Sequence, residues 1–270
     1  MGLDEDTALR ATGDGFWEGA VVDGWETPRG PLGGYVMAIL MRALAAAVDD
    51  PERQPRTVTM HFLRVPEPGP VLVGATVERA GRSVSSVSGR LEQGGKLLGL
   101  ALGAYSKPWE SPHFPAPPMP EVEPADAGRP PGRELPEAKP PEFVERLTMQ
   151  HRFGAAPFSG AEIGETGGWL GLREGRPIDA LALAVLADAW FPAPWPRLAA
   201  LAPAPTIELT IHFRAALPLP DGLLLGRFRS SLVRDGFFGE DGELWAEDGT
   251  LLAQSRQLGL LIGARAPPRR

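Results

Sequence analysis

The stretch TVTMHFLR at residues 57–64 has a near copy far along the chain, TIELTIHFR at residues 206–214. Four positions of the first stretch, TMHF at 59–62, align with TIHF at 210–213, which lies 151 residues later. Both stretches are predicted to be β-strands. A strand that recurs at this distance indicates that the chain is built from two halves of similar fold.

The first half contains one strongly apolar segment between strand candidates. Residues 33–48, GGYVMAILMRALAAAV, are apolar on nearly every face and predict a buried helix. We expect one short strand before this helix and four strands after it, separated by Pro-Gly, Ala-Gly and Gly-Gly turns. The expected strands are residues 16–22, 57–65, 71–79, 83–92 and 96–105.

The second half repeats this order, with a second apolar helix expected at residues 179–191, DALALAVLADAWF. Its expected strands are residues 167–173, 207–214, 223–233, 243–246 and 251–262. A chance match between two strands is the alternative, but the order of elements, the turns and the helix type all agree between the halves. We therefore predict an α+β chain with a double hotdog fold, two antiparallel sheets each wrapped around a long buried helix.

A proline-rich segment lies between the halves. Roughly a third of residues 107–141 are proline, against an average of about 5%. Proline cannot supply a sheet ladder or a helix interior, so this segment is predicted to be an extended surface linker. The expected organisation is an N-terminal hotdog at 1–106, the linker at 107–141 and a C-terminal hotdog at 142–270.

Composition excludes several classes of function. The 270-residue chain carries a net charge of −7 and no basic stripe, which argues against nucleic acid as a partner. It has no cysteine, so thiol nucleophiles, disulfides and thiolate metal sites are excluded, and its four histidines are scattered. No apolar run is long enough to span a membrane, and the acidic start lacks a signal peptide's apolar region. We expect a cytoplasmic protein without a metal site.

The ordered set of motifs resembles the double-hotdog acyl-CoA thioesterases, namely the type II (TesB-like) enzymes and the thioesterase-like superfamily around them. The resemblance covers most of the chain outside the linker. The motifs that carry it are GPLGGYVMAILMRAL, RAGRSVSSVSGRLEQGGKLL, GGWLGLREGRPIDALALAVLADAWFPA, TIELTIHF and DGTLLAQSRQLGLL. It implies hydrolysis of an acyl-CoA thioester to a free acid and CoA, with no metal or organic cofactor.

The resemblance also implies a set of catalytic residues: Asp188 on the second helix, with Thr206 and Gln257 from later strands. Thr210 is a second candidate for the hydroxyl. Independently of the family, Asp188 stands in a segment where every other side chain from 180 to 191 is apolar. A carboxylate in such a place is costly to bury unless it is hydrogen-bonded or its pKa is raised. The structural alternative is an exposed aspartate near the helix end.

The first half lacks these polar groups, because Arg42, Pro55 and Gly103 align with the three catalytic candidates. What it offers instead is the pair Gly33 and Gly34 at a helix start, where unpaired N–H groups point outward. In hotdog thioesterases the site lies between two hotdog units, and a helix-start N–H polarises the thioester carbonyl. We therefore expect one active site per chain, with Gly34 as the electrophilic clamp and Gly33 as a substrate contact.

The remaining expectations concern binding and rival functions. Arg79 and Arg82 flank a hairpin and could bind the phosphates of CoA, although a solvated hairpin is the simpler explanation. Exposed sheet edges could pair two chains into a homodimer. Two alternatives to a thioesterase share the fold: a non-catalytic acyl-CoA or fatty-acid binding protein, and a hotdog enoyl-CoA hydratase. The hydratase would need a histidine close to Asp188, and the next one is His212.

Overall fold

The computed structural model describes residues 2–112, 114–126 and 140–264. Within these residues it has three α-helices, namely α1 (Leu3–Asp6), α2 (Gly33–Val48) and α3 (Ala180–Asp188), and two short 3-10 helices, η1 (Glu142–Arg146) and η2 (Trp195–Arg197). The strands are β1 (Arg10–Gly13), β2 (Phe16–Val21), β3 (Glu26–Thr27), β4 (Gly30–Pro31), β5 (Gln54–Phe62), β6 (Gly69–Ala80), β7 (Val84–Gln93), β8 (Lys96–Ser106), β9 (Leu147–Gly154), β10 (Gly164–Leu172), β11 (Thr206–Phe213), β12 (Leu224–Ser230), β13 (Val233–Arg234), β14 (Phe237–Trp245) and β15 (Leu251–Leu260).

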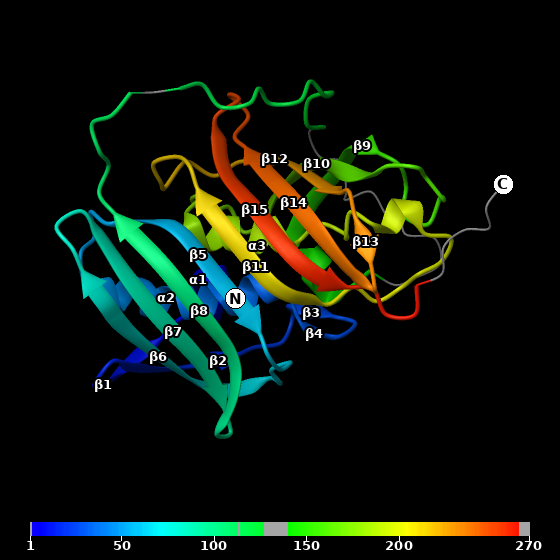
Figure 1. The fold of residues 1–270 in the computed structure, drawn as a ribbon. Coiled ribbons are helices and arrows are strands. Elements are labelled where there is room, and N and C mark those ends of the chain that lie inside the picture. The colour runs from blue at the N-terminus through cyan, green and yellow to red at the C-terminus, as the bar shows by residue number, and fades with distance from the viewer. Residues whose placement is uncertain (1, 113, 127–139, 265–270) are drawn as a thin grey trace.

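The described strands form one large antiparallel sheet and a separate β3–β4 hairpin. The order in the large sheet is β1-β2-β6-β7-β8-β5-β11-β15-β14-β12-β10-β9, with β13 paired to β14 (Figure 1). The prediction of two separate sheets is therefore wrong in this respect. The halves contribute adjacent parts of a continuous sheet, because β5 pairs directly with β11.

The repeated motif forms the junction between the halves. Thr59 pairs with Thr210 in the β5–β11 ladder, and their Oγ1 atoms lie 2.7 Å apart. Thr59 and Thr210 are equivalent positions of the repeat, so the β5–β11 ladder is locally two-fold symmetric about this pair. The two similar stretches of sequence lie side by side in space, and they join the two halves of the sheet.

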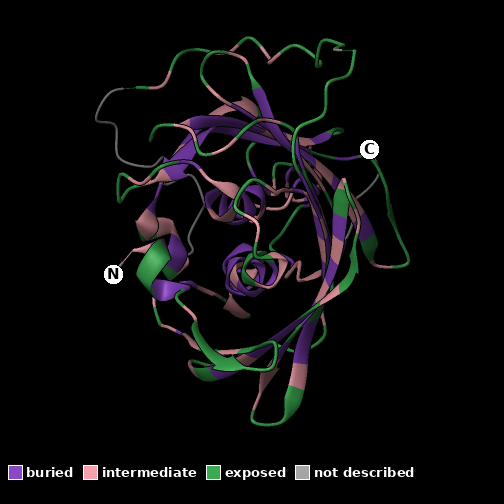
Figure 2. Cartoon of the chain, turned by 90° about the vertical axis from the view of Figure 1, so that its left-hand side faces the viewer, coloured by how far each residue is buried: buried purple, intermediate pink, exposed green. Residues whose placement is uncertain are grey.

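The concave side of the sheet holds α2 and α3, which Figure 2 shows end-on and largely buried. Helix α2 has the predicted bounds and ends at Val48, and the capping residue Asp49 after it takes the left-handed conformation. It packs closely on α3 at Gly34, where an added Cβ would lie 2.3 Å from the carbonyl oxygen of Ala184. Only glycine allows the two helices to approach this closely.

Helix α3 is shorter than predicted. It begins after Asp179, whose side chain accepts a hydrogen bond from Ala182 N at 2.9 Å, and it ends at Asp188 rather than at 191. Pro192 has no N–H to continue the helix and disfavours helical geometry in the residue before it. Because the helix ends early, Asp188 is its last residue.

Part of the proline-rich segment packs against the second half. Glu123 O accepts a hydrogen bond from the Trp169 indole at 2.9 Å. The backbone of Asp126 exchanges two hydrogen bonds with the Gln150 side chain, at 2.8 and 2.9 Å. Residues 127–139 of the predicted linker lie outside the described residues, so the boundaries at 106 and 141 remain predictions.

Strand β14 begins earlier than expected, at Phe237 instead of 243. The turn before it is made by Asp235 and Gly236, both with positive φ. The two glycines and two acids of residues 237–242 are typical of a turn in the sequence. In the structure they extend the strand, which brings Glu240 onto the buried face of the sheet.

Candidate active site

The first turn of α2 meets the last turn of α3, and the candidate site lies at this junction. A Cβ added to Gly33 would lie 3.0 Å from Asp188 Oδ2 and 3.2 Å from Phe62 Cζ at the end of β5. The two helices are therefore arranged with the N-terminus of one beside the C-terminus of the other. The junction combines one glycine-rich segment from the first half with one carboxylate from the second.

Asp188 forms a hydrogen bond across this junction. Its Oδ2 accepts from Gly34 N at 2.8 Å, and the Gly33 amide also interacts with the carboxylate. Burial raises the pKa of Asp188 to about 6, against the opposing effect of these backbone hydrogen bonds. The residue keeps partial exposure. A carboxyl group that titrates in this range and reaches solvent is suited to general-base chemistry.

The sequence predicts that the Gly34 N–H faces the substrate carbonyl, separately from Asp188. The structure instead joins the two groups in a single hydrogen bond, 2.8 Å long. The start of α2 thus stabilises the carboxylate in this structure, as a helix N-terminus does for an anion. A substrate carbonyl would therefore compete with Asp188 for the Gly34 N–H.

Thr206 and Gln257 also meet, within a chain of hydrogen bonds that ends on a carboxylate. The Thr206 hydroxyl donates to Gln257 Oε1 at 2.8 Å, and Gln257 Nε2 donates to Glu240 Oε1 at 2.6 Å. Ala193 N donates to Glu240 Oε2 at 2.5 Å. Gln257 and Glu240 are 8% and 5% exposed, so these polar groups depend on one another for their hydrogen bonds.

Sheet register explains why these side chains share a face. Gln257 pairs with Leu209 on one side and with Glu240 on the other, so all three project to the same side of the sheet. The β11–β15 pairing shifts between Thr206 and Glu208. This irregularity brings Thr206 to the face of Gln257, whereas simple alternation would place it with Glu208.

Thr210 lies elsewhere, because alternation turns it to the opposite face of β11. Its hydroxyl contacts Thr59 Oγ1 at 2.7 Å and donates to the Glu208 carboxylate. Of the two threonines named from the sequence, Thr206 is therefore the one that contacts Gln257.

Glu240 was missed in the sequence. Burial raises its pKa to about 7, and the nearby charge of Asp188 adds to this effect. The electrostatic effect and the Ala193 contact tie the hydrogen-bond chain to the end of α3, since Ala193 follows Asp188 by five residues. Alternation of Phe238, Glu240, Gly242 and Leu244 would have revealed the inward position if the strand had been extended to 237.

The structure separates Arg79 and Arg82 from the carboxylate. Both are exposed and lie by the hairpin at the far end of α2, where Arg53 donates to the Arg82 carbonyl oxygen at 3.2 Å. Arg53 also pairs with Asp50, just after the end of that helix. A 16-residue helix is about 24 Å long, which is the scale of the distance to Asp188.

Arg42, which aligns with Asp188 in the first half, has a different environment. Its guanidinium donates to Thr7 Oγ1 at 2.7 Å and pairs with Asp4 at 2.6 Å. Asp4 also pairs with Arg176 of the second half. Arg42 thus binds the N-terminal segment, which also contacts the second half through Asp4, and it takes no part in the junction at Gly34.

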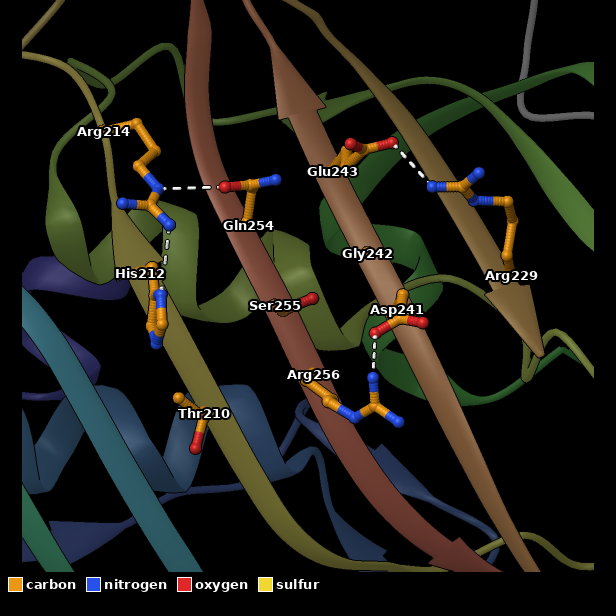
Figure 3. Close-up of a pocket in the computed structure, with 10 residues that line it drawn as sticks. All are labelled: Thr210, His212, Arg214, Arg229, Asp241, Gly242, Glu243, Gln254, Ser255 and Arg256. Atoms are coloured by element: carbon orange, nitrogen blue, oxygen red, sulfur yellow. Dashed lines mark hydrogen bonds and ion pairs between the residues drawn. The ribbon is translucent and has the colours of Figure 1, made fainter. Parts of the chain in front are cut away.

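A shallow hollow of about 280 Å³ lies on the opposite, outer face of the sheet (Figure 3). The figure shows the helices behind the strands and the arginines engaged with neighbours. The pairs are Arg214 with Gln254 at 3.0 Å, Arg229 with Glu243 at 3.3 Å and Arg256 with Asp241 at 3.0 Å. With its cations paired to acids and amides, this face has the character of a solvated sheet surface.

The fold and two matching family models define the class of protein, a hotdog-fold thioesterase. Residues 21–106 match the acyl-CoA thioesterase N-terminal domain and residues 117–261 match the acyl-CoA thioesterase C-terminal domain. The chain belongs to this acyl-CoA thioesterase family, and it is a thioester hydrolase whose family implies an acyl-CoA substrate. The comparison with curated proteins gives no match.

Solved structures agree over nearly the whole chain. A hot dog fold protein of unknown function from Alicyclobacillus acidocaldarius is 27% identical, with a TM-score of 0.82 and 98% of each chain covered. A proposed thioesterase II from Thermobifida fusca is 28% identical, with a TM-score of 0.79, covering 96% of this chain and 97% of the other. An acyl-CoA thioesterase II from Mycobacterium marinum shares the fold at 19% identity and a TM-score of 0.73, covering 100% of this chain and 99% of the other.

None of the helices in the described residues is both long and apolar enough to cross a membrane.

Proposed function

We propose that the protein hydrolyses acyl-CoA thioesters with a water molecule activated by Asp188. The observation that carries the proposal is the partly exposed Asp188 carboxylate at the α2–α3 junction, with its pKa raised to about 6. A base with this pKa is ionised at neutral pH and still basic enough to accept a proton from water in the transition state.

The chemistry proceeds in two steps. Water oxygen adds to the thioester carbonyl carbon while one of its protons passes to Asp188, which gives a tetrahedral oxyanion. The C–S bond then breaks, the carboxylic acid is released, and the proton on Asp188 passes to the thiolate of CoA. A carboxylate has about four lone-pair sites, so Asp188 can hold the Gly34 N–H and still accept from water.

The backbone at the start of α2 assists this transfer of charge. In the resting structure the Gly34 N–H donates to the charged Asp188. As Asp188 takes up a proton, negative charge appears on the carbonyl oxygen, and the same N–H then favours the oxyanion. Gly33, which is partly exposed beside it, lets the substrate carbonyl approach the helix start without obstruction by a side chain.

A covalent route is the mechanistic alternative. Asp188 could attack the thioester itself and form a mixed anhydride, which water would then hydrolyse. The routes differ in a single turnover in ¹⁸O water: direct hydrolysis labels only the released acid, whereas attack by Asp188 allows label to enter the Asp188 carboxylate. Mass spectrometry of the peptide that contains Asp188 distinguishes them.

The test of the function is incubation with a panel of acyl-CoAs and a thiol reagent. We expect thiol release by the wild-type chain and by Asp241→Asn, a matched control on the outer face of β14. Asp188→Asn should bind acyl-CoA without turnover. Loss of enoyl absorbance without thiol release would indicate a hydratase, and saturable binding without either change would indicate a binding protein.

A further inference from the structure

Glu240 is a buried carboxylate for which the proposed hydrolysis has so far no use. Its two oxygens accept hydrogen bonds from Gln257 Nε2 at 2.6 Å and from Ala193 N at 2.5 Å. A single hydrogen bond to a main-chain N–H could be met by a neutral side chain. A buried charge in this place carries a desolvation cost, which raises its pKa to about 7, so its presence calls for a specific role.

The chemistry of Glu240 decides which way the Gln257 amide faces. An ionised carboxylate only accepts hydrogen bonds, so it must face the NH₂ end of the amide. The carbonyl end, Oε1, is thereby turned to Thr206, whose hydroxyl donates to it at 2.8 Å. The direction of the whole chain follows from the charge at its end.

This direction fixes the character of the Thr206 oxygen. A hydroxyl has one proton and two lone pairs, and the proton of Thr206 is already given to Gln257. Towards the site, Thr206 can therefore only accept. A water molecule between Thr206 and Asp188 would direct its two protons to these two acceptors and turn a lone pair away from them, towards the substrate.

We propose that Glu240 is a positioning residue that sets the polarity of the Thr206–Gln257 pair and so orients the attacking water. The inference rests on the proposed hydrolysis at Asp188. It extends the site to a residue that touches neither water nor substrate. In this role Glu240 acts through its hydrogen bond to Gln257, which distinguishes it from a residue that only supports the fold or only adds charge near Asp188.

The variant Glu240→Gln tests this polarity at nearly constant shape. Ala193 N still needs an acceptor, so the carbonyl end of the introduced amide takes that bond and its NH₂ end faces Gln257. Gln257 must then rotate its own amide, which presents NH₂ to Thr206 and forces that hydroxyl to accept. Thr206 then directs its proton at the water, and we expect kcat to fall about 10- to 100-fold with KM within about twofold.

A double-mutant cycle separates positioning from other effects. In a Gln257→Leu background, Glu240→Gln should change kcat by less than about twofold, since the residue it acts through is gone. The exchanged pair, Glu240→Gln with Gln257→Glu, restores the original direction, because the carboxylate now at position 257 accepts from both Thr206 and the amide at position 240. It should recover most of the lost kcat. Asp241→Asn, one residue away on the outer face, should match wild type.

The orientation is also measurable without turnover, from the side-chain amide resonance of Gln257 in the ¹⁵N-labelled chain. We expect it to titrate with Glu240 in wild type and to move to a new, pH-independent position in Glu240→Gln. A chain that releases no thiol but shows this behaviour would contradict the proposed hydrolysis and retain the orientation. An unchanged Gln257 resonance in Glu240→Gln, or an equal loss of kcat in the Gln257→Leu background, would overturn the inference.

Discussion

The two halves place three residues at matching points across the inner face of the sheet, and at two of the three points the residues differ in polarity. The second half has Leu209, Gln257 and Glu240 across β11, β15 and β14. The first half has Val58, Gly103 and Val87 across β5, β8 and β7. The backbone register is the same, so the difference lies in the side chains and in what covers them.

The two halves also differ in the segment that packs over each row of three residues. In the first half, a Cβ added to Gly103 would lie 3.5 Å from Leu44 Cδ1 on α2, so this helix covers the row with apolar side chains. The position that aligns with Leu44 is Trp190, two residues past the end of α3 at Asp188. Helix α3 thus ends before this position, and the Ala193 N–H beyond its end donates to Glu240 at 2.5 Å.

The largest expected effect contrasts the aligned residues Asp188 and Arg42. Asp188→Asn should lower kcat about 10²- to 10⁴-fold, as loss of a general base does. Arg42→Ala should keep kcat within about twofold but lower the melting temperature, because Arg42 contacts only Thr7 and Asp4 among its described polar partners. Steady-state kinetics and thermal unfolding of both variants make the comparison. Equal losses of kcat would contradict the asymmetry.

The adjacent glycines of the first half separate packing from chemistry. Gly34→Ala places a Cβ 2.3 Å from backbone of α3 and should destabilise the fold by about 1–3 kcal/mol, or more. Gly33→Ala meets Asp188 Oδ2 at 3.0 Å, so we expect a loss of kcat with little change in unfolding free energy. Urea denaturation and kinetics together distinguish these outcomes. A stable Gly34→Ala would show that the close helix contact is not required.

The two threonines of β11 sharpen the assignment of the hydroxyl. Thr206→Val removes the donor to Gln257 and should lower kcat about tenfold, the equivalent of one hydrogen bond. Thr210→Val breaks only the contacts with Thr59 and Glu208 at the junction of the halves. Its kcat should stay within about twofold of wild type. A larger loss in Thr210→Val than in Thr206→Val would reverse the assignment.

A further effect, on the pH dependence of stability, is expected from the two buried carboxylates of the second half. The folded-state pKa values of Asp188 and Glu240 are raised to about 6 and about 7, from 3.8 and 4.5. Between these limits the native state binds more protons than the unfolded state, so the free energy of unfolding falls as pH rises from about 4 to 7. Each group contributes about 3 kcal/mol to this loss. Asp188→Asn should lose less stability than wild type over that range in urea denaturation.

Local patterns were sufficient for much of the fold. The repeat, the turns and the apolar run at 33–48 predicted the duplication and the bounds of α2, which the structure confirms. The joining of both halves in one sheet could not be predicted from the sequence. The pairing of the edge strands β5 and β11 is a long-range contact, and local patterns carry no signal for it. The early end of α3 was missed because Trp190 and Phe191 continue the apolar pattern up to Pro192.

The site was only partly predictable for the same reason. Asp188 was conspicuous as one acid among apolar neighbours, but its hydrogen bond to Gly34 spans 154 residues of sequence. Glu240 stood between glycines and acids that indicated a turn, so its burial became visible only with the strand register. Arg79 and Arg82 matched a phosphate-binding composition, yet sequence carries no measure of their distance from the carboxylate.

The asymmetry is tested most directly by the number of acyl-CoA molecules that one chain binds. Asp188→Asn keeps the binding surfaces and stops turnover, so it can be titrated calorimetrically with the acyl-CoA that wild type hydrolyses fastest. We predict one molecule per chain, because in the part of the chain that the structure describes the second half supplies the linked polar side chains, whereas the matching positions of the first half are Val58, Gly103 and Val87. Two equivalent molecules per chain would contradict the account and assign a working site to the apolar row of the first half.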